Sequence, residues 1–339
     1  MESFTELVDL AAERVGGCAL FASDEFFAGK ENLLKAGDGV FVADKYTENG
    51  KWMDGWESRR KRVPGHDYCL VRLGLSGRVH GVDINTQHFL GNYPEAAAVD
   101  LCEAPLDASI EILESQAIQW TEVVPLSRLE GGTQNLFSVN SAVRSTHARL
   151  RIYPDGGVAR FRVYGDVMPD WETLMRSGEP VDLASAMHGG RAVLANDMFF
   201  GHRSNLIMPG RAANMGDGWE TRRKRGPGND WVIVQLGRPG SIEHIEVDTN
   251  HFKGNFPDRC SIEGTFLPPG VPSEFLTSLA IAWKPVLGMT PLRPHHRHFF
   301  GEEILPGGPY THIRLSIYPD GGVSRLRLFG RPVEENLEH

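Results

Sequence analysis

One charged stretch occurs twice in the sequence. Asp54–Asp67 reads Asp-Gly-Trp-Glu-Ser-Arg-Arg-Lys-Arg-Val-Pro-Gly-His-Asp, and Asp217–Asp230 reads Asp-Gly-Trp-Glu-Thr-Arg-Arg-Lys-Arg-Gly-Pro-Gly-Asn-Asp. Only three of the 14 positions differ between the two stretches. Because a repeat at fixed spacing decides architecture before local pattern does, the first question is how far this duplication extends.

The repeat continues on both sides of the charged stretch. Upstream, Val8-Asp9-Leu10-Ala11 corresponds to Val181-Asp182-Leu183-Ala184, and near the end of each copy the sequence Ile-Tyr-Pro-Asp-Gly-Gly appears. The first copy carries about ten extra residues within Lys35–Trp52. We therefore predict two domains of one fold, at residues 8–165 and 181–330, joined by a linker at 166–180.

The composition is that of an ordinary globular protein, with 339 residues of which 41% are hydrophobic and 23% charged. A net charge of -9 argues against a nucleic-acid partner, because that affinity comes from neutralising phosphates. The acidic N-terminus lacks a signal-peptide pattern, and no long apolar run predicts a membrane span. The four cysteines share no position between the copies, which indicates reduced thiols in a cytoplasmic protein. The last residues, 337–339, match the remnant of an affinity tag.

Short strands dominate the local pattern of each copy. Arg149–Ile152 and Ala159–Tyr164 alternate polar and apolar residues, and the Pro-Asp-Gly-Gly between them predicts a β-hairpin. The 38 Gly and 21 Pro suit many turns, so we expect helix only in Phe4–Arg14 and in parts of the linker. These signals predict an all-β chain in which each copy is a β-sandwich or jelly roll. Ligand sites on such folds lie in loops at the sheet edges.

Four consecutive cations in the charged stretch favour an anion-binding loop. Alternate side chains of an extended Arg59–Arg62 point to opposite sides, so Arg60 and Arg62 share one side. One pair could then bind inner acids such as Asp54 and Glu57, while the other pair faces a ligand. Planar guanidinium groups suit bidentate binding of carboxylates. The alternatives are a structural ion-pair network and a solvated charge run.

Histidines supply the second set of candidates. His88 and His251 each end an alternating strand, precede a Gly-Asn loop and occupy equivalent positions in the two copies. Histidine is the side chain best able to exchange a proton near neutral pH, although a structural hydrogen bond is the alternative. His295–His298 holds three further histidines in the second copy only, without the spacing typical of a metal site.

The Asp-Gly-Gly turn near the end of each copy favours a structural role, because turn geometry explains it fully. Arg149 and Arg314, on the strand before each turn, could still reach a site from that side. The sequence contains no GxGxxG or Walker motif, so it gives no support for a nucleotide cofactor.

Together, these motifs resemble those of the allantoicase family. The likeness covers residues 8–330 and includes the charged stretch, the His-Phe-x-Gly-Asn segment and Arg-Leu-x-Ile-Tyr-Pro-Asp-Gly-Gly, in the same order in both copies. The resemblance implies two jelly-roll β-sandwich domains of the galactose-binding-domain-like kind. It also implies a cytoplasmic homo-oligomer, a hydrolase that acts on linear amidines and converts allantoate to ureidoglycolate and urea in purine and allantoin degradation. We expect no cofactor, and the ligand spacing does not support a divalent metal.

The implied reaction suits the candidate residues. Allantoate is a small carboxylate with two ureido groups on one carbon, and urea leaves readily only when an acid protonates the departing nitrogen. General acid–base help of this kind contributes about 10²–10⁴-fold. We expect proton transfer by His88 or His251 together with Glu57 or Glu220. The residues expected to bind the substrate are Arg60, Arg62, Asn92, Arg223, Arg225 and Asn255.

Two rival functions stay open from the sequence. One is a tandem jelly-roll module that binds a small ligand or a carbohydrate without turnover, and the other is a different ureide hydrolase. Binding modules of the first kind usually present exposed aromatic platforms, whereas Trp56 and Trp219 lie within charged loops. The sequence also leaves open whether one or both copies are active.

Overall fold

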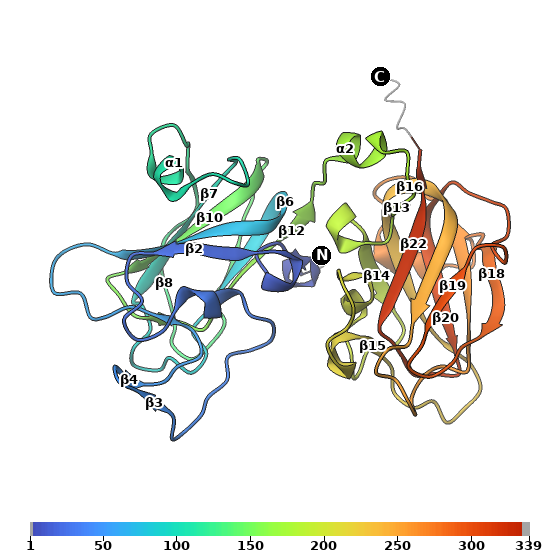
Figure 1. Ribbon diagram of the computed structural model, residues 1–339, viewed down its shortest axis with the longest axis horizontal. Helices are drawn as coiled ribbons and strands as arrows, with labels where there is room; N and C mark the ends of the chain where they lie inside the picture. The colour runs from blue at the N-terminus through green and yellow to red at the C-terminus, as the bar shows by residue number, and fades with distance from the viewer. Residues whose placement is uncertain (1–2, 334–339) are drawn as a thin grey trace. The chain divides into compact units, whose positions relative to one another are not determined.

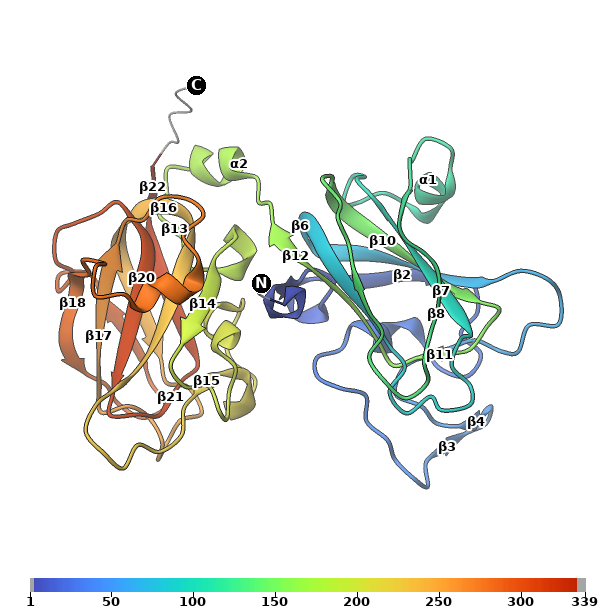
Figure 2. The ribbon, with the colours of Figure 1, turned by 180° about the vertical axis from the view of Figure 1, so that it is seen from behind.

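The computed structural model describes residues 3–333, so the tag assignment at 337–339 lies outside the described residues. The chain separates into two compact units, Met1–Pro169 and Asp170–His339. Within the described residues both units consist of strands, 3-10 turns and two short helices, α1 (Ile110–Glu114) and α2 (Trp171–Arg176) (Figures 1 and 2). The prediction of an all-β chain with two jelly-roll sandwiches is confirmed.

The first unit has the sheet order β1-β12-β6-β10-β7-β8, and β2 and β9 also pair with β6. Its strands are β1 (Val8–Asp9), β2 (Cys18–Ala22), β3 (Tyr46–Thr47), β4 (Gly50–Lys51), β5 (Trp56–Glu57), β6 (Asp67–Asn85), β7 (Ala96–Cys102), β8 (Thr121–Arg128), β9 (Leu136–Ser138), β10 (Arg144–Tyr153), β11 (Gly157–Val158) and β12 (Arg160–Val167). Its 3-10 turns are η1 (Phe4–Glu6), η2 (Glu13–Val15) and η3 (Lys30–Leu34).

The second unit repeats the order of the main sheet, β13-β22-β16-β20-β17-β18, with β14 and β19 also paired to β16. Its strands are β13 (Val181–Asp182), β14 (Arg191–Ala195), β15 (Trp219–Glu220), β16 (Asp230–Asp248), β17 (Arg259–Thr265), β18 (Lys284–Pro291), β19 (Arg297–Phe300), β20 (Tyr310–Tyr318), β21 (Gly322–Val323) and β22 (Arg325–Pro332). Its 3-10 turns are η4 (Ala186–His188), η5 (Arg203–Ile207), η6 (Met215–Asp217) and η7 (Ser273–Thr277).

One long strand organises each unit. Strand β6 is 19 residues long. Its first part pairs with β2 and β10, and its last part pairs with β9 and β12, so β6 belongs to both layers of the sandwich. At Gly74, in the middle of β6, an added Cβ would overlap the backbone nitrogen of Gly17. Only glycine permits this close approach of two backbones. The core beside the strand contains the fully buried Trp56, Phe89 and Phe161.

Two local predictions are wrong. The strands β10 and β12 do not form a hairpin with each other, because both pair with β6, which runs between them. The turn that connects them instead carries β11, which pairs with β5. Phe4–Arg14 is not a helix either, since Val8 and Asp9 pair with β12 and leave only single 3-10 turns on each side. Tertiary pairing overrides the weak local helix preference here.

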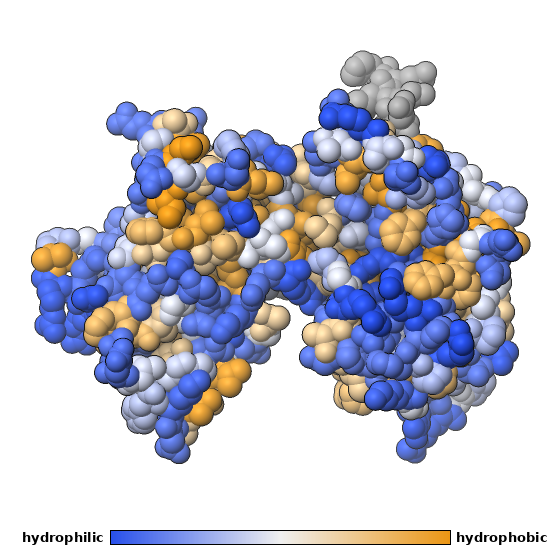
Figure 3. Space-filling view, in the orientation of Figure 1, coloured by the Kyte–Doolittle hydropathy of each residue, from blue (hydrophilic) through white to orange (hydrophobic). Residues whose placement is uncertain are grey.

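The extra residues of the first copy form an exposed excursion that contains the small β3–β4 hairpin. On the visible face, hydrophobic residues are interspersed among hydrophilic ones in both units, near α1 in the first unit and also over the second (Figure 3). Among the described residues, no helix is long and apolar enough to cross a bilayer.

Candidate active site

Strand pairing brings three loops of the first unit together. β5 pairs with β11 so that Glu57 lies opposite Gly157, and the backbone N–H of Ser58 donates to the Gly156 carbonyl at 3.1 Å. Gly156 has φ +132°, and an added Cβ there would lie 2.8 Å from the Asn92 carbonyl oxygen. The Asp-Gly-Gly turn therefore requires glycine, and it packs the Asn92 loop against the charged loop.

Two cations of the charged loop are anchored on acids. Arg59 donates from its backbone N–H and from Nε to Asp24, at 2.9 and 2.6 Å. Lys61 donates from Nζ to Asp67 at 2.6 Å and from its backbone N–H to Asp155 at 2.7 Å. The predicted alternation of the loop is therefore present, with Arg59 and Lys61 as the anchored pair.

The two acids that were expected to anchor the loop, Asp54 and Glu57, do not bind its cations. Asp54 accepts from the buried guanidinium of Arg160 at 2.7 Å, and Glu57 points into a cavity. The expectation that Asp54 and Glu57 hold the loop is therefore wrong. Arg59 and Lys61 bind Asp24 and Asp67 instead, while the Glu57 carboxylate accepts from Asn92.

Arg60 and Arg62, the unanchored pair, line a cavity of about 760 Å³ in the first unit. Neither guanidinium forms an ion pair with another residue of the 3–333 range. The cavity is of the size that small ligands occupy in proteins. The side chains in its wall that can bind a polar ligand are Glu57, Arg60, Arg62, Asn92, Tyr93 and Asp155.

Glu57 is the buried ionisable group of this cavity, with 8% of its surface exposed. Asn92 donates its amide N–H to the carboxylate at 2.7 Å. Burial raises the pKa of Glu57, and the hydrogen bond from Asn92 opposes that rise only in part. A carboxyl group with a raised pKa is suited to exchanging protons near neutral pH.

The second unit repeats the arrangement on a smaller scale. Arg222 and Lys224 are anchored on Asp197 and Asp230, each at 2.8 Å. A cavity of about 400 Å³ lies beside this loop. Its wall contains Glu220, Arg223, Asn255 and Asp320, and Asn255 again donates to the glutamate. Arg225, unlike Arg62, does not line the cavity.

The structure places neither candidate histidine in these cavities. His88 and His251 both adopt left-handed backbone angles, φ 69° and 70°, at the turn after the long strand. The Nε2 of His88 lies 3.0 Å from the Gly39 carbonyl oxygen, and that of His251 lies 2.9 Å from the carbonyl oxygen of Ala212. Each ring thus ties its turn to a neighbouring loop.

The remaining candidates also have structural partners. Arg149 binds Asp100 at 2.8 Å and stacks on Trp120, away from the cavity wall. In the histidine cluster, Arg297 binds Glu246 through two hydrogen bonds, and His298 accepts from a backbone N–H. Within residues 3–333, no group of three His, Cys, Asp or Glu is placed to hold a metal ion.

Sequence reasoning missed Asp155, Tyr93 and Glu95 in the cavity wall. The repeated Asp-Gly-Gly signal was available for Asp155, but turn geometry already explained it. Asp155 in fact combines both roles, because its carboxylate accepts the Lys61 N–H while the residue lines the cavity. Tyr93 and Glu95 differ between the copies, so the repeat gave no signal for them.

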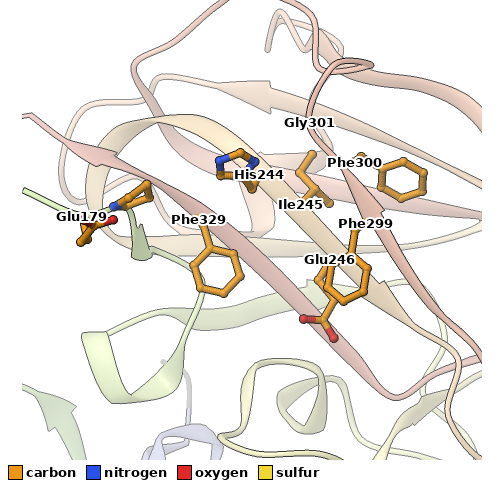
Figure 4. Close-up of a pocket in the computed structure, with 9 residues that line it drawn as sticks. Glu179, His244, Ile245, Glu246, Phe299, Phe300, Gly301 and Phe329 are labelled. Carbon is orange, nitrogen blue, oxygen red and sulfur yellow. The ribbon is translucent and has the colours of Figure 1, made fainter.

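A third cavity, of about 490 Å³, lies in the second unit and is mostly apolar (Figure 4). Phe299, Phe300 and Phe329 contribute rings to it, and His244 lies at its edge. In the first unit, Gly81 occupies the sheet position of His244, and the Phe4 ring packs directly over it. The equivalent surface of the first unit is therefore covered by its own chain.

Known proteins match the chain over nearly its full length. A sequence model described as "Allantoicase repeat" matches residues 8–168 and 181–333. A probable allantoicase of Burkholderia pseudomallei is 51% identical over 323 residues, covering 95% of this chain and 94% of that protein. One from Photobacterium profundum is 48% identical, covering 97% of both chains.

A solved structure shows the same fold. The crystal structure of allantoicase from Saccharomyces cerevisiae superimposes with a TM-score of 0.80 and 34% sequence identity, covering 96% of this chain and 93% of that chain. The cavities beside the two charged loops thus lie in a fold that a solved allantoicase shares over 96% of this chain. The chain belongs to the allantoicase family.

Proposed function

We propose that the chain hydrolyses allantoate to ureidoglycolate and urea in purine degradation, with the first-unit cavity as its catalytic site. Family membership supports the reaction. The observation that carries the choice of site is the buried Glu57 carboxyl, which shares one cavity with Arg60 and Arg62. These guanidinium groups have no carboxylate partner among the described residues, so they are available to an anionic substrate.

Substrate binding follows from the groups in the cavity wall. Arg60 and Arg62 bind the substrate carboxylate, because guanidinium groups form paired, charge-assisted hydrogen bonds with carboxylates. The amide oxygen of Asn92 accepts from a ureido N–H, since its amide nitrogen already donates to Glu57. The second carboxylate oxygen of Asp155 is available to the other ureido group.

Glu57 performs the proposed proton transfers. In its protonated form it gives its proton to the departing ureido nitrogen, and the carbon–nitrogen bond breaks with its electron pair on that nitrogen. The nitrogen of the remaining ureido group donates its lone pair to the central carbon. Water then adds to that carbon and returns a proton to the Glu57 carboxylate. His88 and His251 take no part in this step, because their rings bind backbone carbonyls outside the cavities.

Urea release from allantoate tests the proposal. We expect the wild-type chain to release urea, and Glu57→Gln to lower the rate by about 100-fold or more. Arg60→Lys keeps the charge but loses the planar fork, so it should raise KM. If both variants release urea as fast as the wild-type chain, the site assignment is wrong. Binding of allantoate without any urea release would instead favour a binding module.

Three further expectations belong to the same proposal. The domain limits are proposed as 8–165 and 181–330, with 166–180 as linker. We also infer a cytoplasmic homo-oligomer, which the resemblance to allantoicases supports. Light scattering of the purified chain measures the assembly, and a mass equal to one chain would contradict it.

A further inference from the structure

The cavity of the second unit keeps the recognition groups of the first. Arg223 stands at the sequence position of Arg60, between the anchored Arg222 and Lys224. Asn255 donates to Glu220, as Asn92 does to Glu57. The loop, the amide and the turn are therefore assembled in the same way. This cavity also presents a guanidinium, that of Arg223, which has no ion-pair partner within residues 3–333 and lies beside amide and carboxylate groups.

The same cavity lacks groups that the first cavity has. Only one guanidinium lines it, because Arg225 lies outside the wall. Phe256 stands where the first cavity has Tyr93, so one hydroxyl is lost. Asp258 replaces Glu95 and binds the neighbouring Arg259 at 2.7 Å.

The glutamate and the volume differ as well. Glu220 is half-buried, whereas Glu57 is buried with 8% of its surface exposed. The volume falls from about 760 to about 400 Å³. A smaller cavity with a single guanidinium fits one carboxylate and one amide-bearing arm, instead of a carboxylate with two such arms.

We propose that the second-unit cavity is a binding site for a small carboxylate with a single ureido arm, and that it does not hydrolyse its ligand. This inference rests on the proposed function, because the ligand class is that of the product. Arg223 binds the carboxylate, and Asn255 and Asp320 bind the ureido group. The two repeats thus differ in function, since the first hydrolyses a substrate with two ureido arms while the second binds products with one.

Titration calorimetry with N-carbamoylglycine, a stable one-armed ureido carboxylate, tests the site on the full chain. We expect a binding event that survives the double substitution Arg60→Met and Arg62→Met. Adding Arg223→Met should then weaken it by about tenfold or more, the loss expected for a charge-assisted pair. Lys253→Met is the matched control, because it removes an exposed cation next to the cavity wall without changing the wall. If the affinity for N-carbamoylglycine is unchanged by Arg223→Met, or falls equally in the Lys253→Met control, the proposed site is wrong.

Urea release from the Glu57→Gln chain tests the absence of hydrolysis in the second unit. The rate should fall by the same factor of about 100 or more that the loss of Glu57 predicts. A rate of the same order as wild type would overturn this part of the inference. Should Arg223→Met fail to fold, as judged by circular dichroism, Arg223→Gln replaces it with a smaller polar side chain. The two failures are distinguishable. If the proposed function is wrong, the wild-type chain releases no urea, while the titration still measures binding in the second cavity.

Discussion

Replacing Asp83 with Asn is expected to stabilise the first unit at neutral pH, although it removes a native hydrogen-bonding carboxylate. Asp83 lies on β6 with 1% of its surface exposed. One oxygen accepts from the Gln134 amide at 2.9 Å, and the other has no hydrogen-bond partner within the described part of the chain. Burial raises the pKa of Asp83 to about 6, and nearby Asp9 adds to the rise, while the Gln134 hydrogen bond and Arg162 oppose it.

The raised pKa fixes the sign and size of the effect. Because the folded-state pKa lies above the unfolded value of 3.8, this group stabilises the fold below about pH 4 and loses that contribution as pH rises through about 6. The difference of about two pKa units corresponds to about 3 kcal/mol in the free energy of unfolding. Asp83→Asn cannot ionise, so it should gain about this amount at pH 7.5 and little at pH 4.

The assay is urea unfolding at both pH values, with hydrogen exchange of β6 and β16 peptides to assign the change to one unit. Glu246→Gln is the matched control, because Glu246 occupies the same sheet position in the second unit. It binds Arg297 at 2.7 and 2.9 Å, so its loss should destabilise by about 1–3 kcal/mol. An Asp83→Asn chain that is equally stable, or less stable, at pH 7.5 would refute the reasoning.

Two predictions concern the proposed catalytic site. Lys61→Met frees the charged loop from Asp67, and we expect KM for allantoate to rise about tenfold with kcat little changed, since only binding geometry is lost. Lys224→Met makes the same change in the second unit, and an equal rise in KM there would contradict the choice of the first cavity. Urea release should also decline as pH rises through the raised pKa of Glu57, because the proton donor is lost. Asn92→Ala removes a hydrogen bond that lowers this pKa, so it should move the decline to higher pH, and an unmoved or lower decline would contradict the role of Glu57.

The sequence repeat predicts most of the fold, because two copies with the same turn residues must fold alike. It also identifies the charged loop and the alternation of its side chains. The pairing of strands is harder to predict than the fold. A period-two pattern shows which face of β10 is buried, but it does not show that β6 runs between β10 and β12. Asp24, which anchors Arg59, lies 35 residues upstream and gave no local sign of this contact.

The repeat also led the sequence analysis to candidate site residues, His88 and His251, that lie outside the cavities. His88 recurs as His251 because both copies need the same turn, and a residue kept for folding looks the same as one kept for chemistry. The residues that distinguish the two cavities, such as Tyr93, are those that the repeat did not mark. A tandem duplication therefore identifies the scaffold more readily than the division of roles between its copies.

The ring of Phe4 over Gly81 has a practical consequence for dissecting the chain. The sequence repeat begins at residue 8, but the residue that covers this sheet surface lies four positions earlier. A fragment cut at the repeat boundary would lose this ring and leave Tyr164, its aromatic neighbour at 6.0 Å, open to water. The unit of duplication and the unit that can be excised intact are therefore different lengths of chain.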